Sequence, residues 1–279
     1  MMADNSEKKA LLISVVVPSY KPQSYLWDCL DSIRNQSLEH RRYETIVVLN
    51  GCNEPYKSQI EDYIKKYEKE WTIRLIQTDI PGVSNARNMG IEASQGEFLS
   101  FVDDDDVVSD CFLAELLTVS SNDCIGCSNS VSFAESIELT GNNFLTKAYQ
   151  NCYGKKYSLM KYRQFLSPPV CKLIHKDIIG DIRFPVDLAK SEDSVFCLMM
   201  TPRIKEMKLA SEGCIYYQRK RKGSAMRTKN SFWYELKALF KLETAYLKTW
   251  ARNLFSYQPL FVLSRMAGGL RNFLLYINK

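Results

Sequence analysis

The chain has 279 residues, of which 46% are hydrophobic and 25% are charged, a balance typical of a folded globular protein and not of a disordered or fibrous one. The net charge of +5 is unevenly placed: the segment from Arg219 onward holds thirteen Lys and Arg against two acids, a net of +11, and the residues before it hold 24 against 30, a net of −6. The basic segment carries no recognisable nucleic-acid-reading motif, so we expect no nucleic-acid partner.

The N-terminus and the cysteines indicate the compartment. Residues 1–10 are polar, and we expect a disordered tail there and no signal peptide. The nine Cys are an odd number, scattered among apolar residues, which favours free and mostly buried thiols in a reducing, cytoplasmic setting. Cys124 and Cys127 are a close pair without a second pair at zinc-site spacing, so we interpret them as core residues. No apolar stretch reaches the length expected of a membrane span.

The first hundred residues alternate between apolar runs and segments with helical periodicity. Strands are predicted over residues 11–17, 45–49, 73–77 and 98–102. Helices are predicted after Ser24, over 58–70 and over 84–94, where Gly90 allows close packing. This β-α-β order favours an α/β fold with an open, Rossmann-like and mostly parallel sheet flanked by helices on both faces.

Polar or turn-forming residues follow three of these strands. Pro18 to Tyr20 follow the first strand, Asn50-Gly51 the second, and Asp103 to Asp106 the fourth. Because the carboxyl ends of parallel strands lie along one edge of the sheet, these loops should meet there, where such folds bind ligands.

The four consecutive carboxylates need a compensating partner, because adjacent negative charges repel one another. In an extended chain Asp103 and Asp105 would point to one side and Asp104 and Asp106 to the other, giving an Asp-x-Asp pair. Oxygen ligands of this kind suit Mg²⁺ or Mn²⁺. The alternative is a solvated loop whose acids favour the N-terminus of the helix predicted from Ser109. Taken alone, the acidic run favours neither interpretation.

The second half of the chain is less regular. A helix is predicted over residues 109–119, and residues 121–185 mix short runs that we interpret as an acceptor-shaping region. Glu192 and Asp193 begin a further predicted helix, where acids favour the positive end of the helix dipole. A short strand over 215–217 leads into a basic run from Arg219.

Two or three helices rich in Leu, aromatic residues and Lys are predicted from Phe232 to the end. We expect one face of these helices to pack on the protein while Lys237, Lys241, Lys248 and Arg252 stay outside. The basic and aromatic composition suits an anionic membrane surface, so we expect a cytoplasmic protein that is peripheral on the inner membrane face.

Six motifs occur in a fixed order over most of residues 11–200. They are Val15–Tyr20 (VVVPSY), Leu30–Ser37 (LDSIRNQS), Val47–Gly51 (VVLNG), Gly82–Gly90 (GVSNARNMG), Phe101–Asp106 (FVDDDD) and Glu192-Asp193. This ordered set resembles glycosyltransferase family 2, whose members have the GT-A fold. The resemblance implies transfer of a sugar, with inversion, from a nucleotide-diphosphate sugar such as a UDP-sugar to a hydroxyl of a glycan or lipid-linked acceptor in cell-surface polysaccharide synthesis.

The resemblance also implies a division of the chain. A catalytic domain would cover residues 11–225, with a nucleotide-sugar-binding half over 11–110 and an acceptor-binding half over 111–225. Residues 226–279 would be a C-terminal basic and aromatic helical region.

The donor-binding roles implied by the resemblance fall on residues of these motifs. Pro18 and Tyr20 would form the nucleoside pocket, and Asn50 stands where relatives often carry an acid that contacts the base. Arg87 and Asn88 would lie near the nucleotide, although Arg87 has the alternative of pairing with a nearby carboxylate.

Metal and catalytic roles are implied in the same way. Asp103 and Asp105 would hold Mn²⁺ or Mg²⁺ on the donor diphosphate, with Asp103 and Asp104 in contact with the donor. Asp193 would be the base that deprotonates the acceptor hydroxyl, and Glu192 a supporting acid. Arg219 would belong to a basic loop, continuing to Ser224, that closes over the diphosphate.

Two other functions remain open from the residues. An acidic run after an apolar strand also fits a haloacid-dehalogenase-like phosphatase with one Asp as nucleophile, although there the motif ends the first strand. A non-catalytic protein that binds sugar nucleotides or glycans would keep the fold without turnover.

Overall fold

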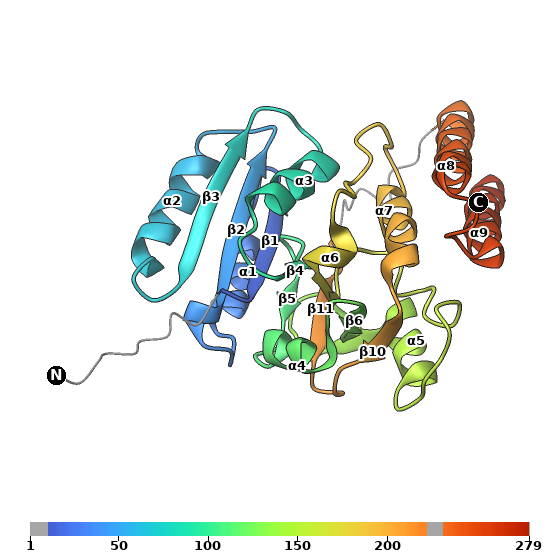
Figure 1. Ribbon diagram of the computed structural model, residues 1–279. Coiled ribbons are helices and arrows are strands. Elements are labelled where there is room, and N and C mark those ends of the chain that lie inside the picture. Colours follow the sequence, from blue (N-terminus) through green and yellow to red (C-terminus); the bar gives the residue numbers. More distant parts are fainter. Residues whose placement is uncertain (1–10, 222–230, 279) are drawn as a thin grey trace.

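The computed structural model describes residues 11–221 and 231–278, and Figure 1 shows how the elements are arranged. The tail predicted for residues 1–10 and the loop residues Lys222, Gly223 and Ser224 lie outside the described residues. A large sheet is flanked by helices, a second and smaller sheet lies beside it, and two long helices stand together at one edge of the molecule (Figure 1).

The predicted strands of the first half all form, and they lie in parallel. The strands are β1 (Ile13–Ser19), β2 (Tyr43–Asn50), β3 (Thr72–Thr78) and β4 (Phe98–Phe101). The helices between them are α1 (Tyr25–Arg34), α2 (Tyr56–Tyr67) and α3 (Val83–Ala93). Every residue of β1, β2 and β4 is buried, as expected for strands covered on both faces. The α/β prediction is confirmed.

Helix α3 crosses β1 closely enough that only glycine fits at the contact. A Cβ added to Gly90 would lie 2.2 Å from Val16 Cγ1. This close approach matters for the site, because α3 carries Arg87 and Asn88 toward the carboxyl end of the sheet.

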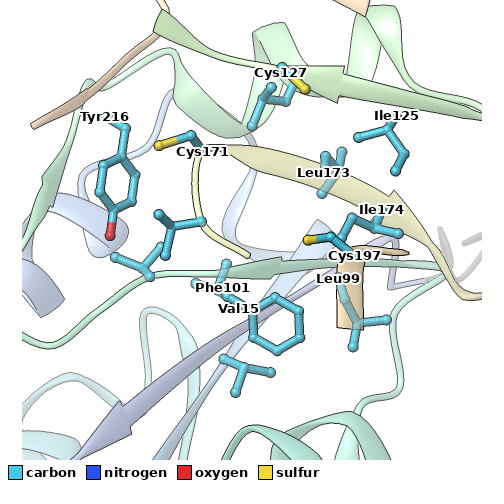
Figure 2. Close-up of a cluster of buried hydrophobic side chains, with 14 of the residues drawn as sticks. Val15, Leu99, Phe101, Ile125, Cys127, Cys171, Leu173, Ile174, Cys197 and Tyr216 are labelled. Carbon is cyan, nitrogen blue, oxygen red and sulfur yellow. The ribbon is translucent and has the colours of Figure 1, made fainter. Parts of the chain in front are cut away.

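The second half extends the large sheet to seven strands, in the order β10-β6-β9-β4-β1-β2-β3. The added strands are β6 (Cys124–Cys127), β9 (Lys172–His175) and β10 (Glu206–Leu209). Only β9 runs antiparallel to its neighbours β4 and β6. Figure 2 shows the apolar layer at this junction, which includes Val15, Leu99, Phe101, Ile125, Cys127, Leu173 and Cys197. Cys124 and Cys127 are buried free thiols, as predicted.

A second sheet, with the order β5-β11-β7-β8, was not predicted from the sequence. Its strands are β5 (Val107–Val108), β7 (Asn129–Phe133), β8 (Thr140–Asn142) and β11 (Ile215–Arg219). Helices α4 (Phe112–Val119), α5 (Phe144–Cys152), α6 (Lys176–Ile179) and α7 (Glu192–Met200) complete this half. Because β5 follows the acidic run directly and pairs with β11, the second sheet fixes the far side of that run.

The C-terminal region forms two helices, as predicted: α8 (Phe232–Arg252) and α9 (Pro259–Ile277). The Tyr246 hydroxyl on α8 lies 2.6 Å from Ser194 Oγ on α7. The four cations expected to stay outside are all exposed. The expectation of no membrane-length segment is wrong by length and composition, because α9 has 19 residues and a mean hydropathy of 1.2.

Candidate active site

The three loops predicted to meet at the carboxyl edge of the sheet are joined by side-chain hydrogen bonds. Ser19 Oγ donates to Asp104 Oδ2 at 2.6 Å, which links the β1 loop to the acidic run. Asn50 Nδ2 donates to the Ser19 carbonyl at 2.7 Å, and Asn50 Oδ1 accepts from Gly82 N at 3.0 Å. Asn50 therefore spans the ends of β1 and β2 and the start of α3, and its prediction as a base contact stays a prediction.

The acidic run is a turn and not an extended strand, so the alternation expected for its side chains is wrong. Asp106 N donates to the Asp103 carbonyl at 3.1 Å, with Asp104 and Asp105 at the centre of the turn. The four side chains point to four different partners. These partners are Arg87 for Asp103, Ser19 for Asp104, Arg221 for Asp105 and Tyr216 for Asp106.

Asp106 holds the acidic turn against β11. Its Oδ2 accepts from the Tyr216 hydroxyl at 2.7 Å and its Oδ1 from Arg219 N at 2.8 Å, while the same hydroxyl accepts from Asp103 N. Burial and the neighbouring acids raise the pKa of Asp106 well above its usual value. Burial also raises the pKa of Asp104, to about 7, against the hydrogen bond from Ser19.

Arg87 joins the acidic turn to the start of α7. Its Nη2 lies 2.9 Å from Asp103 Oδ1 and its Nη1 lies 2.6 Å from Asp193 Oδ1, with Glu192 Oε1 at 3.9 Å. The guanidinium is buried and sits 5.4 Å from the centroid of the Phe184 ring. Burial lowers the pKa of Arg87, but the three carboxylates outweigh it and raise the pKa above the usual value. Arg87 is thus paired with carboxylates, the alternative set out from the sequence, and its phosphate role stays a prediction.

Asp193 is paired with Arg87 and still partly exposed. It stands in the first turn of α7, which follows Ser191 in the left-handed backbone region at φ 62°. Its side chain keeps 28% of its surface exposed, so one carboxylate is both paired with Arg87 and open to a ligand. Burial raises the pKa of Asp193 to about 7, against the lowering effect of Arg87. Such a pKa lets the group take up a proton near neutral pH.

The remaining predicted residues occupy the rim and the supports of the site. Pro18 is buried at the end of β1, and Tyr20 beside it is half exposed, with Lys21 Nζ 5.3 Å from its ring centroid. Asn88 uses both ends of its amide on the backbone of Phe184, at 2.9 and 2.8 Å. Asn88 therefore positions Phe184, whose ring lies beside the Arg87 guanidinium.

The Arg219 side chain lies against the acidic turn, where it contacts a backbone carbonyl and a carboxylate outside the turn. Its Nε donates to the Asp105 carbonyl at 2.8 Å and its Nη2 to Asp28 Oδ2 at 2.9 Å. Arg221 pairs with the Asp105 carboxylate and stacks over the Tyr25 ring, 4.5 Å from its centroid. The described part of the basic loop thus already covers the turn.

Sequence reasoning missed three residues of the site: Ser19, Phe184 and Tyr216. Ser19 lies inside a motif that was noticed, and its hydroxyl at a strand end was the available signal, whereas Arg221 belongs to the basic loop that was predicted. Phe184 and Tyr216 are ordinary apolar positions in the sequence, and only the fold brings them to Arg87 and to Asp106.

The carboxylates of the acidic turn suit a divalent metal ion that takes its remaining ligands from a substrate. Among residues 11–221 and 231–278, no three His, Cys, Asp or Glu are arranged to hold a metal ion. Mg²⁺ and Mn²⁺ bound to phosphates need only one or two protein carboxylates. Asp103, with 38% of its side chain exposed, offers one such carboxylate and Asp105 a second, although an ion must compete with Arg87 and Arg221 for them.

Comparison with known proteins agrees with this geometry. The sequence profile of the family described as "Glycosyl transferase family 2" matches residues 14–182, which run from β1 past the acidic turn and β9. The chain belongs to glycosyl transferase family 2. The family match favours a glycosyltransferase over the phosphatase alternative, and so does the place of the acidic turn after the fourth strand and not the first.

Among relatives of this family 2 glycosyltransferase is the uncharacterized glycosyltransferase EpsJ of Bacillus subtilis, 28% identical over 220 residues that cover 74% of this chain and 61% of EpsJ. Another is the poly(ribitol-phosphate) beta-N-acetylglucosaminyltransferase TarS of Staphylococcus aureus, 23% identical over 76% of this chain and 36% of TarS. The chain thus spans between about a third and three fifths of the length of these relatives.

Solved structures support the GT-A fold of this family member. Residues 1–349 of S. aureus TarS in complex with UDP-GlcNAc superpose with a TM-score of 0.67 at 21% identity, covering 85% of this chain and 66% of that one. The mannosyltransferase PcManGT of Pyrobaculum calidifontis, in complex with GDP-Man and Mn²⁺, gives 0.59 at 12% identity, covering 95% and 74%.

Proposed function

We propose that this glycosyltransferase moves a sugar from a UDP-sugar to a hydroxyl group of a cell-surface polymer, with inversion at the sugar's anomeric carbon. Family membership supports the reaction class. The UDP-GlcNAc complex of TarS supports a uridine donor, and the poly(ribitol-phosphate) on which TarS acts supports a polyol-phosphate polymer as acceptor.

The observation that carries this proposal is the double ion pair of Arg87. Asp103 and Asp193 are 90 residues apart in sequence, yet one guanidinium contacts both carboxylates at 2.9 and 2.6 Å. A donor diphosphate at Asp103 and an acceptor hydroxyl at Asp193 would therefore both be within reach of one anomeric carbon, which a direct displacement with the two groups on opposite sides of that carbon requires.

In this reaction Asp193 accepts the proton of the acceptor hydroxyl, and the hydroxyl oxygen forms a bond to the anomeric carbon. The bond from that carbon to the diphosphate oxygen breaks on the opposite side, and UDP leaves with the electron pair. Arg87 holds Asp193 in place and stabilises its charged form, and Glu192 adds negative charge beside it.

The departing diphosphate carries the second charge that must be stabilised. Asp103 and Asp105 would hold Mn²⁺ or Mg²⁺, which supplies Lewis-acid stabilisation of the leaving group when bound. Arg219 and Arg221 both contact the acidic turn at Asp105 and can contact phosphate once they leave their carboxylate partners.

The experiment that tests the proposal is release of UDP by the purified full chain. UDP-GlcNAc, UDP-glucose, UDP-galactose and GDP-mannose are supplied in turn, each with Mn²⁺, with Mg²⁺ or with EDTA. We expect one UDP-sugar to be hydrolysed slowly, with the rate lost in EDTA and in the variant D103N. The variant D187N, an exposed carboxyl in the segment before α7, is the matched control and should keep the wild-type rate.

The other functions give different results in the same assay. A phosphatase would release phosphate from p-nitrophenyl phosphate and leave the nucleotide sugars intact. A binding module would show no turnover with any donor while a UDP-sugar still raised its melting temperature. Either result would refute the proposed reaction.

A further inference from the structure

The α8–α9 hairpin leaves a long apolar face uncovered among the described residues. Trp233, Phe240 and Leu247 are exposed on α8, and Leu263, Leu270 and Leu274 are exposed on α9. Phe255, in the turn between the two helices, is fully exposed at 101%. Figure 1 shows α8 and α9 together at the edge of the molecule, beyond α7. We call this surface the hairpin face.

The spacing of these residues gives each helix one apolar line. Trp233, Phe240 and Leu247 are seven residues apart, so they lie along one line on α8. Leu263, Leu270 and Leu274 are spaced by seven and four residues and form a second line on α9. The opposite sides of the helices are buried, with Tyr246 and Phe261 against the protein. Apolar patches of this extent on a globular protein mark a site of interaction.

Positive charge flanks the apolar line of α8. Lys237, Lys241, Lys248 and Arg252 are all exposed, and none forms an ion pair with a carboxylate in residues 11–221 or 231–278. The two acids of the hairpin lie elsewhere, since Glu235 pairs with Lys190 and Glu243 faces α9, with its Oε1 2.6 Å from where a Cβ on Gly269 would be. A second copy of the chain would place these cations against one another, whereas an anionic lipid surface would neutralise them.

A cavity continues this cationic surface at the turn of the hairpin. It has a volume of about 580 Å³, and Arg203, Arg252 and Tyr257 are among its lining residues. Because Arg203 is paired with Asp181 and Arg252 has no described carboxylate partner, the cavity has spare positive charge beside Tyr257. An aromatic side chain beside a cationic hollow suits the headgroup level of a bilayer, where rings and phosphates lie together.

The contacts of Arg265 decide between lying on a membrane and crossing it. Helix α9 is long and apolar enough to span a bilayer. However, Arg265 is buried, and its guanidinium donates to Ser167 Oγ and to the Arg163 carbonyl, both at 2.7 Å. Spanning would pull this cation off the protein and into lipid at a high cost. A helix that stays docked through Arg265 therefore lies on the bilayer and does not cross it.

We propose that the hairpin face binds an anionic lipid bilayer, with its leucines and aromatic rings in the interface and its cations at the lipid phosphates, while both helices lie in the membrane plane. This inference does not rest on the proposed sugar transfer. It places the catalytic domain on the membrane surface, and in a cytoplasmic protein this is the inner face.

Flotation of the full chain with vesicles tests the proposal. We expect the protein to float with vesicles of phosphatidylglycerol and phosphatidylcholine in equal parts, and to stay at the bottom with phosphatidylcholine alone. The pair L270S/L274S removes apolar contacts and should weaken binding about tenfold or more. The triple variant K237Q/K241Q/K248Q should weaken it about a hundredfold, since each cation near an anionic surface contributes about a factor of five.

The matched control is I137S/L139S, which replaces two exposed apolar residues on the segment between β7 and β8. We expect it to bind vesicles as the wild type does, and all variants should keep the wild-type circular dichroism and melting temperature.

Wild-type protein that fails to float with anionic vesicles would overturn the proposal. So would a dimer in light scattering that becomes a monomer in L270S/L274S without vesicle binding, which would assign the face to a second copy. Retention on vesicles after alkaline carbonate extraction would show that α9 spans the bilayer and would also overturn it.

Discussion

Replacing Asp193 by Asn should inactivate the enzyme and at the same time stabilise it above neutral pH. Asn keeps the shape of the side chain and its hydrogen bond to the protein but cannot take a proton from a hydroxyl. We expect D193N to lose UDP release with acceptor by a factor of about 10² to 10⁴, the usual contribution of a general base. The stability effect has the opposite sign, because the carboxylate is held in a site that raises its pKa to about 7.

The magnitude follows from that pKa. A rise from 3.8 to about 7 corresponds to about 4 kcal/mol at about 1.4 kcal/mol per pKa unit. Because 28% of the side chain is exposed, solvent screens part of this energy, and we expect about 2 kcal/mol. Between pH 4 and pH 7 the folded wild type binds more protons at this carboxyl than the unfolded chain does. This contribution therefore lowers wild-type stability as pH rises through that window, and the loss is complete above pH 7.

Urea denaturation of D193N and wild type at pH 4, 5, 6, 7 and 8 measures the effect. The difference in free energy of unfolding should shift in favour of D193N by about 2 kcal/mol between pH 4 and 8, with most of the change below pH 7. Asp104 also has a pKa raised to about 7, but it is present in both proteins and largely cancels in the difference. The exposed control D187N should give a difference that does not change with pH. A D193N difference that is constant over the whole range would refute the reasoning, because it would mean that the pairing with Arg87 outweighs burial.

Three further results are expected from the same site. R87A leaves the carboxylates of Asp103 and Asp193 without their shared cation, so the free energy of unfolding in urea at pH 7 should fall by about 3 kcal/mol, and unchanged stability would contradict the buried pairing. N88A leaves the backbone N–H and carbonyl of Phe184 unpaired and should cost about 1–3 kcal/mol in the same titration. The control N85A removes an amide of the same helix whose contact with the Ile80 carbonyl is exposed, and it should cost less than N88A. The transfer rate at saturating donor should rise with pH through about 7 as Asp193 loses its proton, and a rate that is level from pH 5.5 to 8 would remove Asp193 from the role of base.

The first half of the chain was predictable because its signals are local. Apolar runs of strand length and helical spacing recur through β4, and the predicted helices and strands agree with the structure to within a few residues. The meeting of three strand-end loops followed from parallel topology alone, and the bonds from Ser19 to Asp104 and from Asn50 to Ser19 confirm it. The domain boundaries and the individual roles of the site residues remain predictions.

The acidic turn was not predictable in the same way. Four identical residues give no signal of where the chain bends, and the bend is set by Tyr216 and Arg219, more than a hundred residues later. The second sheet escaped prediction for a related reason, since β5 has two residues and β8 three, too few to show a period. In both cases distant pairing determines the local shape.

The hydrogen bonds between the acidic turn and β11 have a consequence for the order of folding during synthesis. Asp106 is held by residues 110 and 113 positions further along the chain. During synthesis β1 to β4 can therefore pair and bury their apolar side chains well before Tyr216 leaves the ribosome, while Asp105 and Asp106 still lack Arg221 and Tyr216. Closing so long a loop is entropically costly and comes late. The first four strands can thus pair before the acidic turn has its last two partners.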